Sequence, residues 1–362
     1  MILVDAHEDL AWNMLTFGRD YTRSAAETRR IESSTETPAL NGDTLLGWDD
    51  YQRGRVALIF ATLFAAPLRA KLGQWDTQYY ADPDQAQKRY RGQLDAYYQL
   101  AEEHPDMFQL VLDQRSLKDV LLPWENEAFA GHRKVGLIPL MEGAECVRNV
   151  DELDDWWTRG VRIIGPAWRG TRFCGGTFDP GPLTKEGYEL LDGMAAFGFA
   201  LDISHMDEKA VLQALDFYPG RVMASHSNAA ALLNGVESNR FLSNRVISGL
   251  IERDGVIGVV PFNRFLDPKW KPSDGCEQIS LRDVVTHIDH ICQIAGDACH
   301  VGIGTDFDGG FGLQETPSEI DTIADLQKLA PLLAEKGYTD ENIAAILGQN
   351  WIRFLTHLLP AR

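Results

Sequence analysis

Five apolar segments of this chain each run directly into a carboxylate or an imidazole. They end at His7 and Asp9, at Glu142, at His205, at His226 and at Asp306. Side chains two apart on a strand point the same way, so the end of the first strand offers His7 and Asp9 together. The other groups are spread over most of the chain, and only a closed or strongly curved parallel sheet brings so many strand ends to one rim. The pattern therefore predicts a metal hydrolase built on a parallel barrel.

The order of apolar and helical patterns supports this architecture. Eight short apolar or β-rich runs occupy residues 2–6, 56–63, 135–141, 161–167, 199–204, 222–225, 256–262 and 300–305. Helical spacing of apolar residues follows in 83–103, 184–197, 207–217, 243–253 and 281–294. Strands that alternate with helices imply a parallel sheet. We therefore expect one α/β domain over residues 1–362, a (β/α)8 TIM-type barrel with long βα loops over its C-terminal rim.

Two connections are too long for ordinary βα loops. Residues 12–55 are polar and rich in Thr, Glu and Gly, and we expect them to fold over the rim as a partial lid. In residues 65–82, the side chains of Trp75, Tyr79 and Tyr80 could wall a pocket, although packing on the surface would explain them equally well. Helical patterns in 320–336 and 340–359 should close the barrel from outside.

Composition excludes several classes of partner and site. With 53 Asp and Glu against 34 Lys and Arg, the formal charge of −19 argues against nucleic acid and anionic membrane surfaces as partners. The five cysteines include no CxxC pair, so neither a disulfide framework nor a thiolate zinc site is expected. The first strand starts at Ile2 and leaves no room for a leader peptide, and no stretch approaches the roughly 20 apolar residues of a membrane helix. These features predict a cytoplasmic location.

Each of these acidic and histidine residues, considered singly, could have a purely structural role. A buried histidine can be a core residue, Glu142 can cap a helix or pair with a cation, and Asp306 can be a turn or cap residue, a role that suits Asp308 better because two glycines follow it. Their joint occurrence favours a binuclear metal site, with Glu142 able to bridge two ions. Such ions share and acidify a water, and Asp306 is then placed for proton transfer.

The segments VDAHEDL, LMEGAE, LDISHM, ASHSN, GIGTDFDGG and GQNWIRFL together resemble the membrane dipeptidase (renal dipeptidase) family of binuclear zinc metallopeptidases. The resemblance implies a (β/α)8 barrel in which one zinc takes His7, Asp9 and Glu142 and the other takes Glu142, His205 and His226. It also implies that Asp306 handles protons around a metal-bridging hydroxide. Arg240 is similar to the arginine that grips the free carboxylate of the dipeptide, with an ordinary surface arginine as the alternative. Family members often accept L-Xaa-D-Xaa substrates and often form dimers, so a homodimer is an option.

The sequence departs from the family pattern in the fourth strand. Trp168 stands where the family usually places a histidine near the scissile carbonyl. An indole N–H donates one hydrogen bond but cannot become cationic, so stabilisation of the oxyanion would fall to the metals or to Arg169 or Arg172. We therefore expect a zinc-dependent dipeptidase with Asp306 and Glu142 as catalytic residues and Arg240 and Trp168 in contact with substrate. The alternatives are a metal-dependent hydrolase of an N-acyl amino acid or a lactone, and a non-catalytic metal-binding relative.

Overall fold

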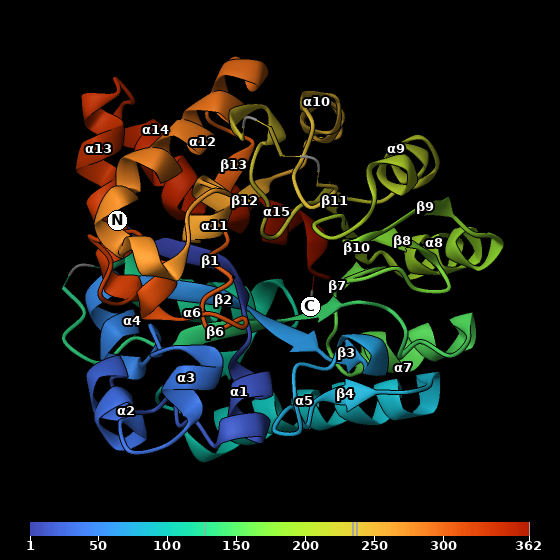
Figure 1. Cartoon of the computed structure of the whole chain (residues 1–362), viewed down its shortest axis with the longest axis horizontal. Coiled ribbons are helices and arrows are strands. Elements are labelled where there is room, and N and C mark those ends of the chain that lie inside the picture. Colours follow the sequence, from blue (N-terminus) through green and yellow to red (C-terminus); the bar gives the residue numbers. More distant parts are fainter. Residues whose placement is uncertain (127, 234, 237, 362) are drawn as a thin grey trace.

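The computed structural model describes residues 1–126, 128–233, 235–236 and 238–361, and its centre is a barrel of parallel strands (Figure 1). Within the described residues, eight strands run around the barrel in the order β11-β10-β7-β6-β2-β1-β13-β12, and each neighbouring pair is parallel. A further parallel bridge between Ala224 and Ile257 joins the two ends of this order. The strands are β1 (Leu3–Glu8), β2 (Val56–Phe64), β6 (Val135–Glu142), β7 (Ile163–Gly165), β10 (Ala200–Asp202), β11 (Val222–Met223), β12 (Ile257–Val259) and β13 (Val301–Ile303). The predicted (β/α)8 barrel is confirmed.

The outer helices begin where the sequence offers capping side chains. They are α5 (Pro83–Glu103), α6 (Gln114–Glu125), α7 (Leu153–Thr158), α8 (Lys185–Phe197), α9 (Glu208–Phe217), α10 (Asn244–Glu252) and α12 (Leu281–Ala295). Asp82, Thr184 and Ser243 each accept a hydrogen bond from a backbone N–H in the first turn of α5, α8 and α10, as N-cap residues do. The helices cover the barrel, so strands β1 and β6 are buried on both faces.

Residues 12–55 form a helical block rather than the lid we expected. They contain most of α1 (Leu10–Phe17) and all of α2 (Ala25–Glu32), α3 (Thr37–Asn41) and α4 (Trp48–Gly54), which lie together beside the barrel in Figure 1. Asp308, fully buried, ties this block to the loop after β13. Its carboxylate lies 3.0 Å from Arg19 Nη1 and accepts hydrogen bonds from the Tyr21 hydroxyl at 2.8 Å and from Leu45 N at 3.2 Å. Among the described residues of this connection, Trp12 is the one that lines the central pocket.

The C-terminal segments pack against the barrel from outside, as predicted. They are η7 (Ile323–Lys328), α13 (Leu329–Glu335), α14 (Asp340–Ala344), the π-helical turn η8 (Ala345–Gln349) and α15 (Asn350–Leu358). Trp351 Nε1 donates to Ile303 O of β13 at 3.0 Å, and Asn350 Nδ2 donates to Val301 O at 2.8 Å. A Cβ at Gly302 would lie 2.3 Å from the Trp351 indole nitrogen, so this close approach requires glycine.

Short elements complete the loops. They are β3 (Ala66–Pro67) paired with β4 (Tyr79–Tyr80), the hairpin of β8 (Cys174–Gly176) and β9 (Asp179–Leu183), the short helix α11 (Asn263–Leu266), and the 3-10 turns η1 (Leu68–Ala70), η2 (Val150–Glu152), η3 (Ala230–Leu232), η4 (Pro272–Asp274), η5 (Cys276–Gln278) and η6 (Leu313–Glu315). Strand β5 (Phe108–Leu110) pairs with the start of β6 and was not predicted, because three residues are too few to show a pattern. Of the helices in the described part of the chain, none is long and apolar enough to cross a membrane.

Candidate metal centre and substrate pocket

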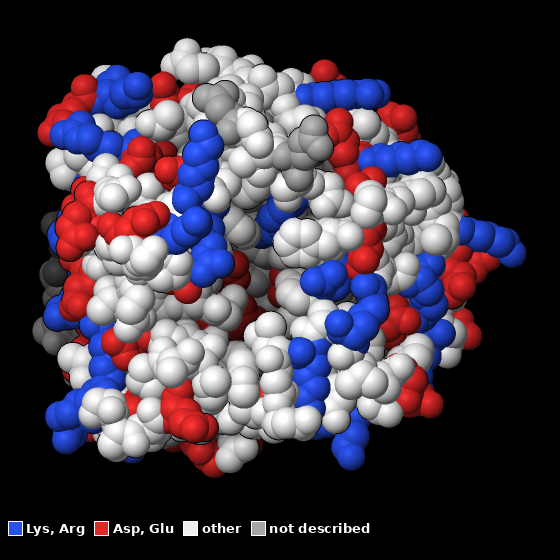
Figure 2. Space-filling model, in the orientation of Figure 1, with Lys and Arg blue, Asp and Glu red and all other residues white. Residues whose placement is uncertain are grey.

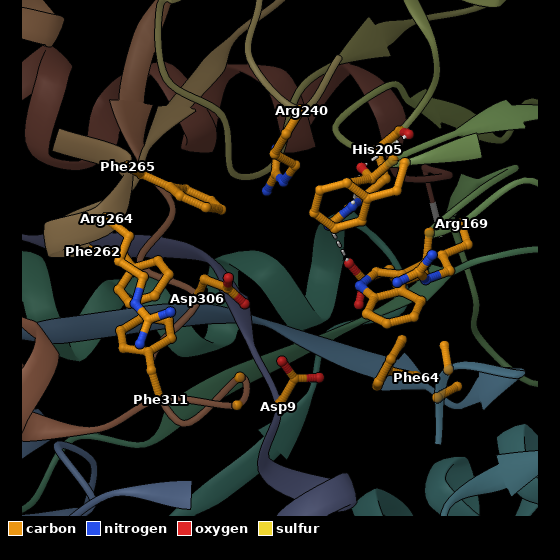
Figure 3. A pocket seen from close by; sticks show the side chains of 18 of the residues that line it. Asp9, Phe64, Arg169, His205, Arg240, Phe262, Arg264, Phe265, Asp306 and Phe311 are labelled. Carbon is orange, nitrogen blue, oxygen red and sulfur yellow. Dashed lines mark hydrogen bonds and ion pairs between the residues drawn. The ribbon is translucent and has the colours of Figure 1, made fainter. Parts of the chain in front are cut away.

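The six acidic and histidine side chains singled out in the sequence all stand at the carboxyl ends of barrel strands. His7 lies in β1 and Asp9 follows it, Glu142 ends β6, and His205, His226 and Asp306 come three residues after β10, β11 and β13. Figure 3 shows Asp9, His205 and Asp306 directed into one pocket. The barrel topology therefore gathers residues that are far apart in sequence, as the strand pattern predicted.

Glu142 lies at the centre of this cluster. Its Oε1 is 2.9 Å from His205 Nε2 and 3.5 Å from His226 Nε2, while its Oε2 is 3.6 Å from His7 Nε2. Ligand atoms within 4.8 Å of one another form the groups His7, Asp9, Glu142 and Glu142, His205, His226, and a third group combines His7 and His226 with Asp306. The first two groups are the two ligand sets that the family resemblance implied, and they share Glu142.

The surroundings of these atoms fit divalent cations. His205 Nε2 and His226 Nε2 face each other at 2.9 Å, and His7 Nε2 and Asp9 Oδ1 are buried without a hydrogen-bond partner among the described residues. Buried polar atoms without a partner reduce the stability of the folded protein unless a ligand such as a cation binds them. A Cβ at Gly309 would lie 2.7 Å from Asp9 Oδ2, so glycine keeps the space above this carboxylate open. Imidazole nitrogens and carboxylate oxygens are the donors that zinc takes.

Hydroxyl groups orient two of the imidazoles. Thr177 Oγ1 lies 2.9 Å from His205 Nδ1, and Ser225 Oγ lies 2.7 Å from His226 Nδ1. Ser225 Oγ also donates to Asp202 Oδ2 at 2.5 Å. Such partners fix the ring orientation and direct Nε2 toward a metal. Our sequence reasoning missed these residues, although the serine beside each histidine was a visible signal for part of the network.

The three histidines of the cluster differ in the direction of their pKa shifts. Burial lowers the pKa of His205 to about 4, helped by the Arg240 cation, and burial lowers the pKa of His226 well below its ordinary value. Burial would also lower the pKa of His7, but Glu142 and Asp9 outweigh it and raise the pKa to about 10. Two imidazoles are therefore neutral and ready to bind a cation at neutral pH, whereas the third holds a proton that a metal must displace.

Neighbouring histidines keep the pKa of Glu142 below that of Asp306. Burial alone would raise the pKa of Glu142, but His7 and His205 lower it below its ordinary value. Burial raises the pKa of Asp306 to about 7, with the Glu142 charge adding to the effect. Asp306 also adopts φ +59°, uncommon for a residue other than glycine, and its N–H donates to His7 O at 3.1 Å. This backbone holds its carboxylate 3.8 Å from His7 Nε2.

A cavity of about 530 Å³ lies over the cluster, and Figure 2 shows its mouth on this face with acidic and basic side chains at the edge. Arg240, 4% exposed, lines it and donates to Ser204 O at 3.0 Å, Ser227 Oγ at 3.2 Å and His226 O at 2.8 Å. Trp168 also lines it, with its ring 6.3 Å from that of His205. Both residues that we expected to contact substrate thus reach the pocket.

The structure decides two alternatives that the sequence left open. Arg172, considered for the oxyanion, pairs with Glu145 at 2.9 Å and Glu186 at 3.0 Å and does not line the cavity, whereas Arg169 does. Of the two explanations left open for the aromatic residues of 65–82, packing outside the pocket holds, because this segment lines the pocket with Ala66, Ala70, Leu72 and Asp76. Trp75 stacks instead on Phe17, at 5.4 Å between ring centroids. Aromatic walls come from other segments of the chain, through Trp12, Phe64, Trp168, Phe178, Phe241, Phe262, Phe265 and Phe311.

The membrane dipeptidase family (peptidase family M19) matches residues 1–359. The chain belongs to this family. As an M19 member it is a metallodipeptidase, and the predicted family is confirmed. The dipeptidase tcpJ of Claviceps purpurea is 32% identical over 178 residues, which cover 48% of this chain and 38% of that relative.

Two solved metallopeptidase structures share the fold of this M19 member. The structure of dipeptidase AC has a TM-score of 0.78 and 23% identity, with 100% of this chain and 99% of that chain covered. A metallopeptidase from Rhodobacter sphaeroides, bound to a phosphinate mimic of the dipeptide L-Ala-D-Ala, has a TM-score of 0.77 and 22% identity, with 99% of each chain covered.

Proposed function

We propose that this M19 member hydrolyses dipeptides with a free C-terminal carboxylate and that it holds two zinc ions in doing so. His7, Asp9 and Glu142 would hold one ion and Glu142, His205 and His226 the other. The observation that carries the proposal is that these two groups share one carboxylate at the floor of a substrate-sized cavity. Divalent ions bound there supply Lewis acidity, which polarises a peptide carbonyl and acidifies a water.

Arg240 is suited to anchor the substrate carboxylate. Its guanidinium has five N–H donors, and three hydrogen bonds to Ser204, Ser227 and His226 leave two donors over. One of these is the Nε–H, which is buried and has no partner among the described residues. The three bonds fix the guanidinium, so the remaining donors can meet a carboxylate with little loss of conformational entropy.

Asp306 is suited to move the proton. Its carboxylate lines the cavity beside His7 and Asp9, where it could accept a proton from an attacking water and return it to the leaving amine. Trp168 packs edge-on against Phe64, at 4.9 Å between ring centroids, and would shape the space beside the scissile bond. The mimic of L-Ala-D-Ala bound by the Rhodobacter sphaeroides relative supports testing a D residue at the leaving position.

The test is metal content combined with a substrate panel. We expect two equivalents of zinc per chain by mass spectrometry and turnover of L-Xaa-D-Xaa dipeptides in preference to N-acyl amino acids and lactones. Asp306→Asn should lower kcat by about 10²- to 10⁴-fold, the range for general acid–base groups. Turnover confined to the non-peptide substrates, or an Asp306→Asn enzyme with unchanged kcat, would overturn the proposal.

A further inference from the structure

Three arginines line the pocket, and two of them have ion-pair or hydrogen-bond partners within the protein. Figure 3 shows Arg264 and Arg169 on opposite walls, with Arg240 between them. Arg264 pairs with Glu315 at 2.8 Å, and Arg240 is bonded as described above. Arg169 differs, because no carboxylate among the described residues lies within 4.0 Å of its guanidinium, and its buried Nε has no hydrogen-bond partner there.

Aromatic rings hold the Arg169 guanidinium in place without supplying an anion. Its Cζ lies 5.1 Å from the centroid of the Phe178 ring and 5.9 Å from that of the Trp168 ring. Both distances fall in the range of cation–π attraction. Phe178 is itself held at the tip of the β8–β9 hairpin, where its N–H donates to Asn239 Oδ1 at 3.1 Å. The cation is therefore preorganised at the pocket wall.

Other buried or half-buried arginines of the described chain that lack a carboxylate, such as Arg240 and Arg253, donate to backbone carbonyls, whereas the Nε of the half-buried Arg169 has no partner. Its neighbours in the fold have carboxylate partners: Arg69 pairs with Asp179 at 2.5 Å, and Arg172 pairs with Glu145. A partly buried cation needs a compensating anion to offset its lost hydration. At the wall of a substrate cavity, that anion can come from the substrate.

We infer that Arg169 binds a second carboxylate of the substrate, so that the preferred dipeptides carry an acidic side chain. The inference rests on the proposed function, in which Arg240 takes the main-chain carboxylate. A bidentate guanidinium–carboxylate contact explains why this position carries a fixed planar fork rather than a neutral residue.

Matched acid and amide substrates test this inference. The panel compares L-Ala-D-Glu with L-Ala-D-Gln and L-Glu-L-Ala with L-Gln-L-Ala on the zinc-loaded enzyme. We expect kcat/KM to favour the acid in at least one pair by about 10- to 100-fold, as for a charge-assisted hydrogen bond. Arg169→Met should abolish this ratio, mainly through KM, and Arg169→Lys should restore part of it. Arg264→Met is the matched control and should leave the ratio as in the wild type.

Each outcome decides the inference. If Arg169→Met lowers kcat/KM equally for acids and amides, the residue acts on the main chain or on the fold, and the inference fails. It also fails if the wild-type enzyme hydrolyses dipeptides with no preference for acids, although the proposed function then stands. If no dipeptide is hydrolysed, the proposed function itself fails. Unfolding temperatures of all variants are measured, and Arg169→Gln replaces Arg169→Met if the latter does not fold.

Discussion

Replacing Asp308 by alanine tests how the helical block of residues 12–55 is held to the barrel. Asp308 and Arg19 form an ion pair at 3.0 Å in which both side chains are fully buried. Removing one partner of such a pair costs about 3–5 kcal/mol, because the other charge stays buried. In the variant, Arg19 would still form its ion pair with Glu32 at 3.0 Å. The loss of the Asp308–Arg19 pair should therefore cost an amount at the lower end of that range.

The substitution also leaves the Tyr21 hydroxyl and Leu45 N–H without their acceptor, at about 1 kcal/mol or more each. We therefore expect a loss of about 5 kcal/mol in the free energy of unfolding. Urea unfolding followed by tryptophan fluorescence measures it. Asp321→Ala is the control, since Asp321 also pairs with an arginine, Arg29, but its side chain is 71% exposed, and we expect less than about 1 kcal/mol. Equal losses in the two variants would refute the reasoning.

Three further predictions concern the pocket. Glu142→Gln removes the charge shared by both ligand groups and should lower zinc affinity by at least about 100-fold, measured by chelator competition; wild-type affinity would contradict its bridging role. Zinc binding to the metal-free protein at pH 7.5 should release at least one proton, because a pKa of about 10 keeps His7 protonated until a metal displaces the proton, and affinity should weaken as pH falls. Calorimetric heats that do not depend on the ionisation enthalpy of the buffer would exclude this release. Arg240→Met should lower kcat/KM by about 10- to 100-fold for dipeptides with a free carboxylate and less for their amides, and equal losses would argue against anchoring.

The sequence alone determined the barrel and the cluster at its rim. Apolar segments repeat along the chain, and the acidic and histidine residues of the candidate site stand at or just after their ends, as Glu142 and Asp306 do. Because parallel strands in a closed barrel end at one rim, the linear order of the motifs is enough to place His7 near His226. The six residues that motifs marked all meet in the structure.

The tertiary structure alone decided which loop side chains reach the pocket. Arg169 and Arg172 stand three residues apart in one irregular loop, yet one faces the cavity and the other pairs with Glu145. Asp308 stands in a turn, as expected, but only the folded chain pairs its buried carboxylate with Arg19. Loops have no periodicity that fixes side-chain direction, so these outcomes depend on contacts between residues distant in sequence, which form only when the chain is folded.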